Sequence, residues 1–246
     1  MGPVIDFHSH IWDDPKQVHS IIEQMDRVGV DQVCLSSLTA HYPTEEQITR
    51  SNQQVAQCIE WYPKRVLGFC YLNPRHGNFS LAELKKAKEE WGMVGIKLWV
   101  SCLCTDEAVK PILQKAAEYK MPVLIHTFLK QTGNLPFESK PEDVAQVAVD
   151  NPDVAFVMAH LGGDWERGCK TVQYLQNVWT DTSGSIAQLG MIEKAVKTLG
   201  SNRVLFGSDA PVDLAFSYAK VQGSMLTEDE KEAVFGKNAL RLLFQR

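Results

Sequence analysis

Two short segments, PVLIHT at residues 122–127 and VAFVMA at residues 154–159, give the strongest indication of the fold class. Both are almost entirely apolar, and each is short enough to be a single strand. A strand that is apolar on both faces is typical of a parallel sheet, because helices cover both sides of such a sheet. The two stretches therefore predict buried parallel strands with helices between them.

Runs of the same kind recur along the chain, with starts about 24 to 34 residues apart. The predicted strands cover residues 4–8, 32–37, 66–72, 94–99, 122–127, 154–159, 178–182 and 203–208. The segments between them carry apolar residues at helical spacing, as in residues 18–28, which Gly29 follows as a stop signal. Eight such units fill the 246 residues, close to the ~250 of a (β/α)8 barrel. The sequence thus predicts an α/β fold, a single (β/α)8 TIM-barrel domain over residues 1–246.

The composition is that of a folded, slightly acidic protein. Hydrophobic residues make up 44% and charged residues 22% of the chain, and the formal net charge is -5. These values exclude a disordered chain and argue against a nucleic-acid or anionic-membrane partner, since both need a basic face. No apolar run approaches the ~20 residues of a membrane-spanning helix. Six scattered cysteines and a first segment unlike a signal peptide lead us to expect reduced thiols and a cytoplasmic location.

Polar side chains cluster at the ends of the predicted strands, which is where barrels of this type place their working residues. These residues are His8 and His10 at the first strand, Lys97 in the fourth, His126 at the fifth, His160 at the sixth and Asp209 after the eighth. Because alternate residues of a strand point to the same side, His8 and His10 should both face the barrel mouth.

Converging imidazole nitrogens and a carboxylate would form a site for a divalent metal. Such donors suit Zn2+, the ion that we expect, and also Mn2+, Fe2+ or Ni2+. Taken singly, the motifs have simpler explanations. A His-x-His pair occurs by chance, a buried histidine is often a hydrogen-bonded core residue, and Asp209 could cap the next helix. Their joint position at strand ends that converge favours a metal site instead.

Several motifs resemble those of the amidohydrolase superfamily. They are DFHSH (6–10), YLNP (71–74), GIKL (95–98), IH (125–126), AHLGG (159–163), GSDAP (207–211) and NALRLL (238–243). They keep the superfamily's order, so the chain resembles its amidohydrolase-related (amidohydrolase 2) branch of TIM-barrel metal-dependent hydrolases. The resemblance implies that His8, His10 and Asp209 hold a first metal and that His126 completes a one-metal site.

The resemblance leaves one or two metal ions open. In one-metal members the residue that matches His160 polarises the substrate or helps to move protons. In two-metal members a carboxylated lysine at the position of Lys97 bridges the ions, and the residues matching His126 and His160 bind the second ion. Lys97 could instead be an ordinary lysine that pairs with Asp209 or a substrate carboxylate, since carboxylation requires burial and a neighbouring metal to lower its pKa.

The resemblance implies a metal-dependent hydrolase that cleaves an amide, lactone or other ester bond. A bound metal lowers the pKa of water to ~7, and Asp209 would take the proton of that water and return it to the leaving group. The metal and His160 would stabilise the oxyanion. Non-oxidative decarboxylases of small aromatic or enoic acids belong to the same branch and remain an alternative. A non-catalytic metal-binding barrel is a third interpretation.

Aromatic and basic residues lie just past the predicted strand ends, where they would line the pocket. They are Trp12, Arg75, Trp99, Phe128 and Lys130. Aromatic walls with a cation favour a small, partly apolar, anionic substrate. The connections look short, so we expect a pocket that is open or completed by a neighbouring chain, and a homodimer as the assembly.

Overall fold

Eight parallel strands form one sheet in the order β1 to β8 in the computed structural model, which describes residues 2–184 and 186–244. The strands are β1 (Ile5–Trp12), β2 (Gln32–Leu38), β3 (Val66–Leu72), β4 (Gly95–Leu98), β5 (Val123–Ile125), β6 (Phe156–Met158), β7 (Val178–Asp181) and β8 (Val204–Leu205). The sheet closes because the Phe7 amide donates to the Phe206 carbonyl at 2.8 Å and Ser9 bridges to Asp209. The predicted (β/α)8 barrel is confirmed.

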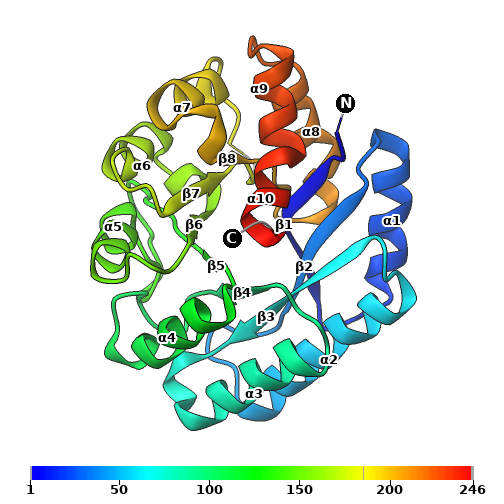
Figure 1. Ribbon diagram of the computed structural model, residues 1–246, viewed down its shortest axis with the longest axis vertical. Coiled ribbons are helices and arrows are strands. Elements are labelled where there is room, and N and C mark those ends of the chain that lie inside the picture. Colours follow the sequence, from blue (N-terminus) through cyan, green and yellow to red (C-terminus); the bar gives the residue numbers. More distant parts are fainter. Residues whose placement is uncertain (1, 185, 245–246) are drawn as a thin grey trace.

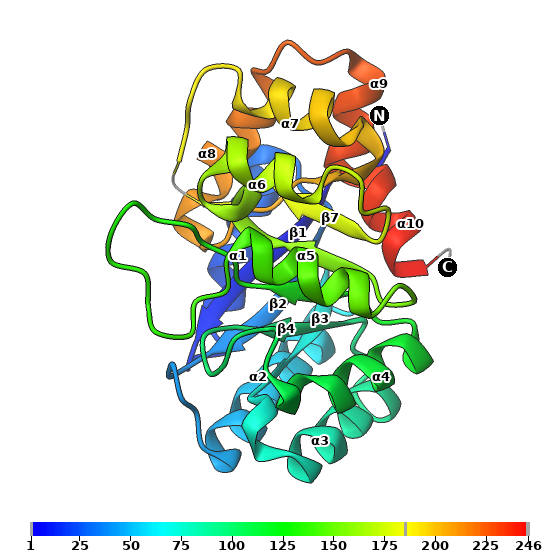
Figure 2. The same ribbon diagram turned by 90° about the vertical axis from the view of Figure 1, so that its left-hand side faces the viewer.

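Helices follow the strands and surround the barrel (Figures 1 and 2). They are α1 (Gln17–Val28), α2 (Glu45–Trp61), α3 (Asn78–Glu89), α4 (Lys110–Tyr119), α5 (Pro141–Asp150), α6 (Trp165–Val172), α7 (Met191–Leu199), α8 (Leu214–Gln222), α9 (Glu228–Glu232) and α10 (Asn238–Phe244). The last of these, α10, packs Ala239 and Leu242 against the interior residues Ile5 and Phe7. It therefore covers the end of the barrel at which the strands begin.

Local signals account for the helix boundaries. The apolar face of α1 buries Val18, Ile21 and Met25. Gly29 ends the helix in the left-handed conformation (φ 82°), which a residue without a side chain adopts at little cost. In α9 the Thr227 side chain caps the helix, and the Glu230 side chain bonds back to the Thr227 amide. This reciprocal pair satisfies amides that the first helical turn leaves free.

The core has two layers. Inside the barrel, Phe7 and Phe69 meet edge to face at 5.4 Å among aliphatic side chains. A Cβ atom at Gly95 would lie 2.5 Å from the Phe69 ring, so only glycine leaves room for that ring. A second and larger apolar layer lies between the strands and the helices around them. Both faces of the strands are therefore buried, as their continuous hydrophobicity predicts.

Strand boundaries differ most from the prediction where the chain reaches the barrel mouth. Strand β1 continues past residue 8 to Trp12, with a register shift between Asp6 and Ser9. The predicted strand at 203–208 shrinks to Val204–Leu205. Polar residues at the barrel mouth interrupt the apolar pattern of these two strands. A prediction based on hydrophobicity therefore places the ends of the strands wrongly.

The connection between β5 and α5 corrects the expectation of short loops. It runs from residue 126 to residue 140 and projects beyond the strand ends (Figure 2). A bridge between Thr127 and Ser139 holds its two ends together. Below, residues 126–140 are called the β5–α5 loop.

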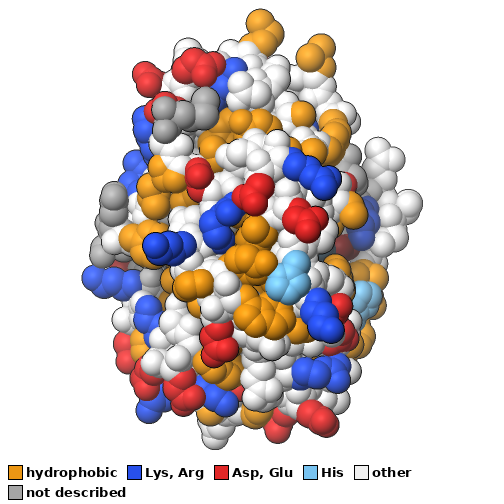
Figure 3. All heavy atoms as spheres, turned by 90° about the vertical axis from the view of Figure 1, so that its right-hand side faces the viewer, with side chains coloured by type: hydrophobic (Ala, Val, Ile, Leu, Met, Phe, Trp, Pro, Cys, Tyr) orange, Lys and Arg blue, Asp and Glu red, His pale blue; other side chains and the backbone are white. Residues whose placement is uncertain are grey.

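The six cysteines are buried and unpaired, as expected for reduced thiols. Among the described residues, no helix has the length and hydrophobicity that a membrane span requires. On the face in Figure 3, acidic and basic side chains are interspersed with hydrophobic ones. Opposite charges also form exposed pairs, such as Arg50 with Asp13 at 3.1 Å.

Candidate metal centre

Three donor atoms converge at the mouth of the barrel. The Nε2 atoms of His8 and His10, two residues apart on β1, are 2.9 Å from each other. The Asp209 Oδ1 atom lies 3.4 Å from His8 Nε2 and 3.6 Å from His10 Nε2. A tetrahedral zinc ion with ligand bonds of ~2.0–2.1 Å separates its donors by about 3.3 Å, so these spacings fit one ion. The structure thus brings together the three residues predicted for a first metal.

Unusual backbone conformations place two of the site residues. His160 (φ 59°) and Asp209 (φ 73°) both adopt the left-handed region, which is uncommon for residues other than glycine. The end of β8 is also anchored, because the buried Asp6 carboxylate accepts hydrogen bonds from the Ser208 amide at 2.9 Å and hydroxyl at 2.6 Å. Strained conformations of this kind persist where the surrounding structure demands them, often at functional sites.

A buried network behind the histidines determines where their protons lie. The Asp181 carboxylate is 2.9 Å from His8 Nδ1 and accepts the hydroxyl proton of Ser183. The Ser183 oxygen lies 2.9 Å from His160 Nδ1 and 3.0 Å from His8 Nδ1. Because the hydroxyl proton goes to Asp181, both Nδ1 atoms must donate. The Nε2 atoms of His8 and His160 are then lone-pair donors that face the site.

A carboxylate of the β5–α5 loop bonds to the Nε2 atom of His126, so this ring has the opposite tautomer to the rings of His8 and His160. The Nε2 atom of His126 lies 3.0 Å from Glu138 Oε1, and its Nδ1 atom lies 3.3 Å from His160 Nε2. Burial raises the pKa of Glu138, but hydrogen bonds from His126 and Lys130 outweigh it and lower that pKa to about 2. Glu138 is therefore an acceptor, and Nδ1 of His126 carries a lone pair toward His160. His126 contacts His160 and lies outside the compact group formed by His8, His10 and Asp209.

Lys97 is fully buried, and its Nζ atom is 2.9 Å from His8 Nε2. Burial lowers its pKa to about 8, against the attraction of Asp209 and Asp181. Burial also lowers the pKa of His8 well below its usual value and that of His160 to about 3. The histidines are thus neutral at pH 7, the form that binds metal.

The chemistry of the donor set fits a divalent metal. Neutral imidazole nitrogens and a carboxylate point at one space, while their outer atoms bond to Asp181, Ser183 and, from His10 Nδ1 at 2.7 Å, Ser36. Outer hydrogen bonds of this kind are typical of metal-binding histidines. Zn2+ and Mn2+ both accept such ligands, so zinc remains a prediction.

The predicted pocket residues fall into two groups. Trp12, the last residue of β1, lies 6.4 Å from His10 and 5.6 Å from Trp99 between ring centres, and Phe128 stacks on His126 at 6.3 Å. These aromatic rings border the metal site.

The two basic residues are paired with protein groups. The Arg75 guanidinium lies 4.4 Å from the centre of the Phe137 ring and 3.5 Å from Asp106. The Lys130 ammonium lies 3.0 Å from both carboxylate oxygens of Glu138. A role for either in substrate binding stays a prediction, and a substrate anion would have to compete with these partners.

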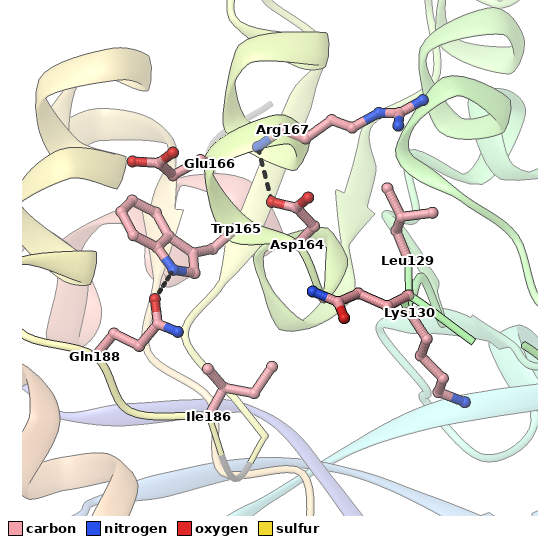
Figure 4. Close-up of a pocket in the computed structure, with 10 residues that line it drawn as sticks. Leu129, Lys130, Asp164, Trp165, Glu166, Arg167, Ile186 and Gln188 are labelled. Carbon is pink, nitrogen blue, oxygen red and sulfur yellow. Dashed lines mark hydrogen bonds between the residues drawn. The ribbon is translucent and has the colours of Figure 1, made fainter. Parts of the chain in front are cut away.

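Figure 4 shows a cleft of about 580 Å³ that none of the proposed metal ligands lines. It is lined by the β5–α5 loop, the start of α6 and the loop after β7. The Trp165 indole donates to Gln188 Oε1 at 2.7 Å across one side, and the Lys130 side chain extends from another. Gly163 of the cleft packs closely against Phe128, whose ring lies between the cleft and His126 in the contact chain from one to the other.

Sequence reasoning missed Asp181, Ser183 and Glu138. Asp181 ends β7, so the rule that singled out the other strand ends could have found it. Ser183 lies two residues further on, on the same side. Glu138 is twelve residues beyond His126 in an irregular loop. No local pattern marks it, because only the path of the loop brings it back.

Comparisons with known proteins identify the family and the fold. Residues 5–245 match the amidohydrolase family. Among solved structures, a 2,6-dihydroxybenzoate decarboxylase from Rhizobium is 16% identical over 99% of both chains, with a TM-score of 0.80. A dihydroxybenzoic acid decarboxylase from Polaromonas sp. JS666, solved with manganese and the inhibitor 2-nitroresorcinol, is 17% identical over 100% of this chain and 98% of its own, with a TM-score of 0.80.

A solved structure named as a hydratase, and not as a decarboxylase, has the same fold. A 4-oxalomesaconate hydratase from Rhodopseudomonas palustris is 19% identical over 98% of this chain and 95% of its own, with a TM-score of 0.72. A search among curated protein sequences found no significant match. Structural likeness at such low identity shows the fold alone. The family match spans nearly the whole chain, and the chain therefore belongs to the amidohydrolase family.

Proposed function

We propose that the protein is a metal-dependent, non-oxidative decarboxylase of a small aromatic acid. The observation that carries the proposal is the group of His8, His10 and Asp209 at the barrel mouth, bordered by aromatic rings. Solved structures named as dihydroxybenzoate decarboxylases share this fold over their full length, and one of them holds manganese. This support favours decarboxylation over the hydrolysis that we expected first from the sequence.

The residues of this chain would hold one metal through His8, His10 and Asp209, with His126 as a further ligand. When bound, the metal supplies positive charge that orients and polarises a substrate carboxylate or a neighbouring oxygen. The bond between the ring carbon and the carboxyl carbon breaks, CO2 leaves, and the electron pair stays on the ring carbon. Asp209, whose pKa burial raises, would take up a proton from solvent and give it to that carbon, and the lone pair of His160 Nε2, 3.9 Å away, would face the protonated carboxyl group.

Other residues would bind and enclose the substrate. Trp12, Trp99 and Phe128 offer apolar rings to an aromatic acid, and they exclude water from the reacting carbon. The cleft beside Phe128 would receive substituents that do not react.

Hydrolysis with two metal ions is the second candidate, and one observation favours it. The lone pairs of His126 Nδ1 and His160 Nε2 face each other at 3.3 Å, and a second cation between them would bind to both nitrogens. Lys97 stands beside His8, where a carboxylated lysine could bridge two ions. This arrangement suits cleavage of an amide or ester by activated water.

The deciding experiment measures CO2 release from a panel of hydroxybenzoates by protein loaded with Mn2+ or Zn2+. A parallel panel of esters, lactones and amides is assayed for hydrolysis with the same preparations. CO2 and the decarboxylated arene in equal amounts, lost in the D209N variant, would support the proposal. Hydrolysis without CO2 release would overturn it and establish the second candidate.

Metal content per chain separates the candidates independently of substrate. The protein is purified without chelator, with added metal and bicarbonate, and analysed by plasma mass spectrometry. We expect about one ion per chain. Two ions, falling to one in K97M, would instead support a Lys97-bridged pair.

A further inference from the structure

The β5–α5 loop contains a carboxylate with an unusual number of partners. Glu138 is buried, with 3% of its surface exposed, although it lies in an irregular segment. Its Oε2 atom accepts from the Asn134 side chain at 2.8 Å and from the Leu135 amide at 3.1 Å. Both oxygens accept from Lys130 at 3.0 Å. These bonds hold the carboxylate in one place within the loop.

The remaining bond of Glu138 points inward, to His126 Nε2 at 3.0 Å. His126 itself follows β5 directly, so the barrel fixes its backbone, and the groups that contact its ring set the direction of the ring. The ring stacks on Phe128 at 6.3 Å, an apolar contact that does not distinguish its two nitrogens. Glu138 is the described group that bonds to the outer nitrogen of this ring.

We infer that Glu138 is a positioning residue that sets the tautomer and direction of His126. By accepting the Nε2 proton, it leaves Nδ1 as a lone pair aimed at the metal site. The loop thus supplies the outer partner for His126, as Asp181 and Ser183 do for His8 and His160. Removing an outer partner of a metal-binding histidine typically lowers metal affinity ~10–100-fold. The part of this inference that concerns metal rests on the proposed function, whereas the tautomer does not.

The first test uses metal-free protein, so it stands whether or not the proposed function is correct. The 15N shifts of the His126 ring are measured by NMR at pH 8, where the neutral form prevails. We expect the Nε2-protonated tautomer in the wild type and a mixture of tautomers in E138A. A wild-type ring protonated on Nδ1, or a ring unchanged in E138A, would overturn the inference.

The second test measures the Mn2+ dissociation constant by calorimetry. We expect it to rise ~10–100-fold in E138A and less in E138Q, whose amide oxygen can still accept from His126. The control is N134A, which loosens the loop by removing the Asn134 bonds to this carboxylate, to the Phe128 carbonyl and to the Lys130 amide, but leaves the bond from His126 to Glu138. It should change the constant less than about threefold.

The comparison distinguishes positioning from loop stability. If N134A weakens Mn2+ binding as much as E138A, Glu138 acts only by holding the loop, and the inference is wrong. If E138A does not fold, as judged by circular dichroism, the same comparison is made between E138Q and N134A. A wild type that binds no Mn2+ would refute the proposed function, and the tautomer result would still decide the role of Glu138.

Discussion

Asp209 has the most exposed side chain of the three converging ligands, with 35% of its surface accessible. It is therefore the ligand that a substrate can reach. Replacing it by Asn should lower turnover about 10²–10⁴-fold, because the amide cannot hold or release a proton as a carboxylate does. The fold should persist, since Asn tolerates the left-handed backbone at this position. Turnover and circular dichroism check this prediction, and retained activity would remove Asp209 from the reaction.

Ser183 has a structural effect larger than its size suggests, because one hydroxyl serves Asp181, His8 and His160. The S183A variant should lose about 1–3 kcal/mol of unfolding free energy, since it leaves buried polar groups without a partner. Ser217 provides a matched control. Its buried hydroxyl has no hydrogen-bond partner among the described residues, so S217A should cost less. Urea unfolding measures both, and equal losses would contradict the role assigned to Ser183.

Among the secondary-structure elements, α8 is hydrogen-bonded to the loop that follows β7. The Lys220 ammonium donates to the Thr182 carbonyl at 2.8 Å and the Gly184 carbonyl at 2.7 Å. Burial lowers its pKa to about 8, although Asp181 and other carboxylates attract the charge. This contact joins a helix on the outside of the barrel to the loop that carries Ser183.

The lowered pKa of Lys220 makes stability depend on pH. Between about pH 8 and the ordinary lysine pKa of ~10.4, the unfolded chain binds more protons than the folded one. The unfolding free energy of the wild type should therefore rise with pH in this window, relative to K220M. Urea unfolding of both proteins at pH 7.5 and pH 10 tests this, and a difference that falls or stays constant would show that the charged lysine is not disfavoured.

At the scale of the whole molecule, a metal held by residues of β1 and the end of β8 joins the first and last strands of the barrel. Removing it with a chelator should lower the melting temperature. A ligand at 100 times its Kd stabilises by ~2.7 kcal/mol, which corresponds to roughly 5–10 °C for a chain of this size. Thermal scans before and after EDTA treatment, and after Mn2+ is returned, measure the shift. If the melting temperature does not change although the metal has been removed, the ion does not stabilise the barrel.

The sequence predicts the barrel well because its signal is repeated. Eight apolar runs at similar spacing each predict a buried strand. An error of a few residues in the predicted end of one strand therefore does not change the predicted architecture. The residues at the strand ends were predicted for the same reason. Parallel strands that close into a barrel bring those ends together, wherever they occur in the chain.

The fold class and the family could thus be predicted from the sequence, which also singled out His8, His10, His126, His160 and Asp209 as candidate site residues. The three-dimensional arrangement was needed to show which of them converge, which nitrogen of each ring faces the site, and that Asp181, Ser183 and Glu138 bond to the outer nitrogens. The physical reason is that apolar periodicity is a local property that recurs along the chain, whereas a hydrogen bond between residues far apart in sequence depends on the path of the whole backbone. The partner of His126 lies in an irregular loop, and no spacing rule could have found it.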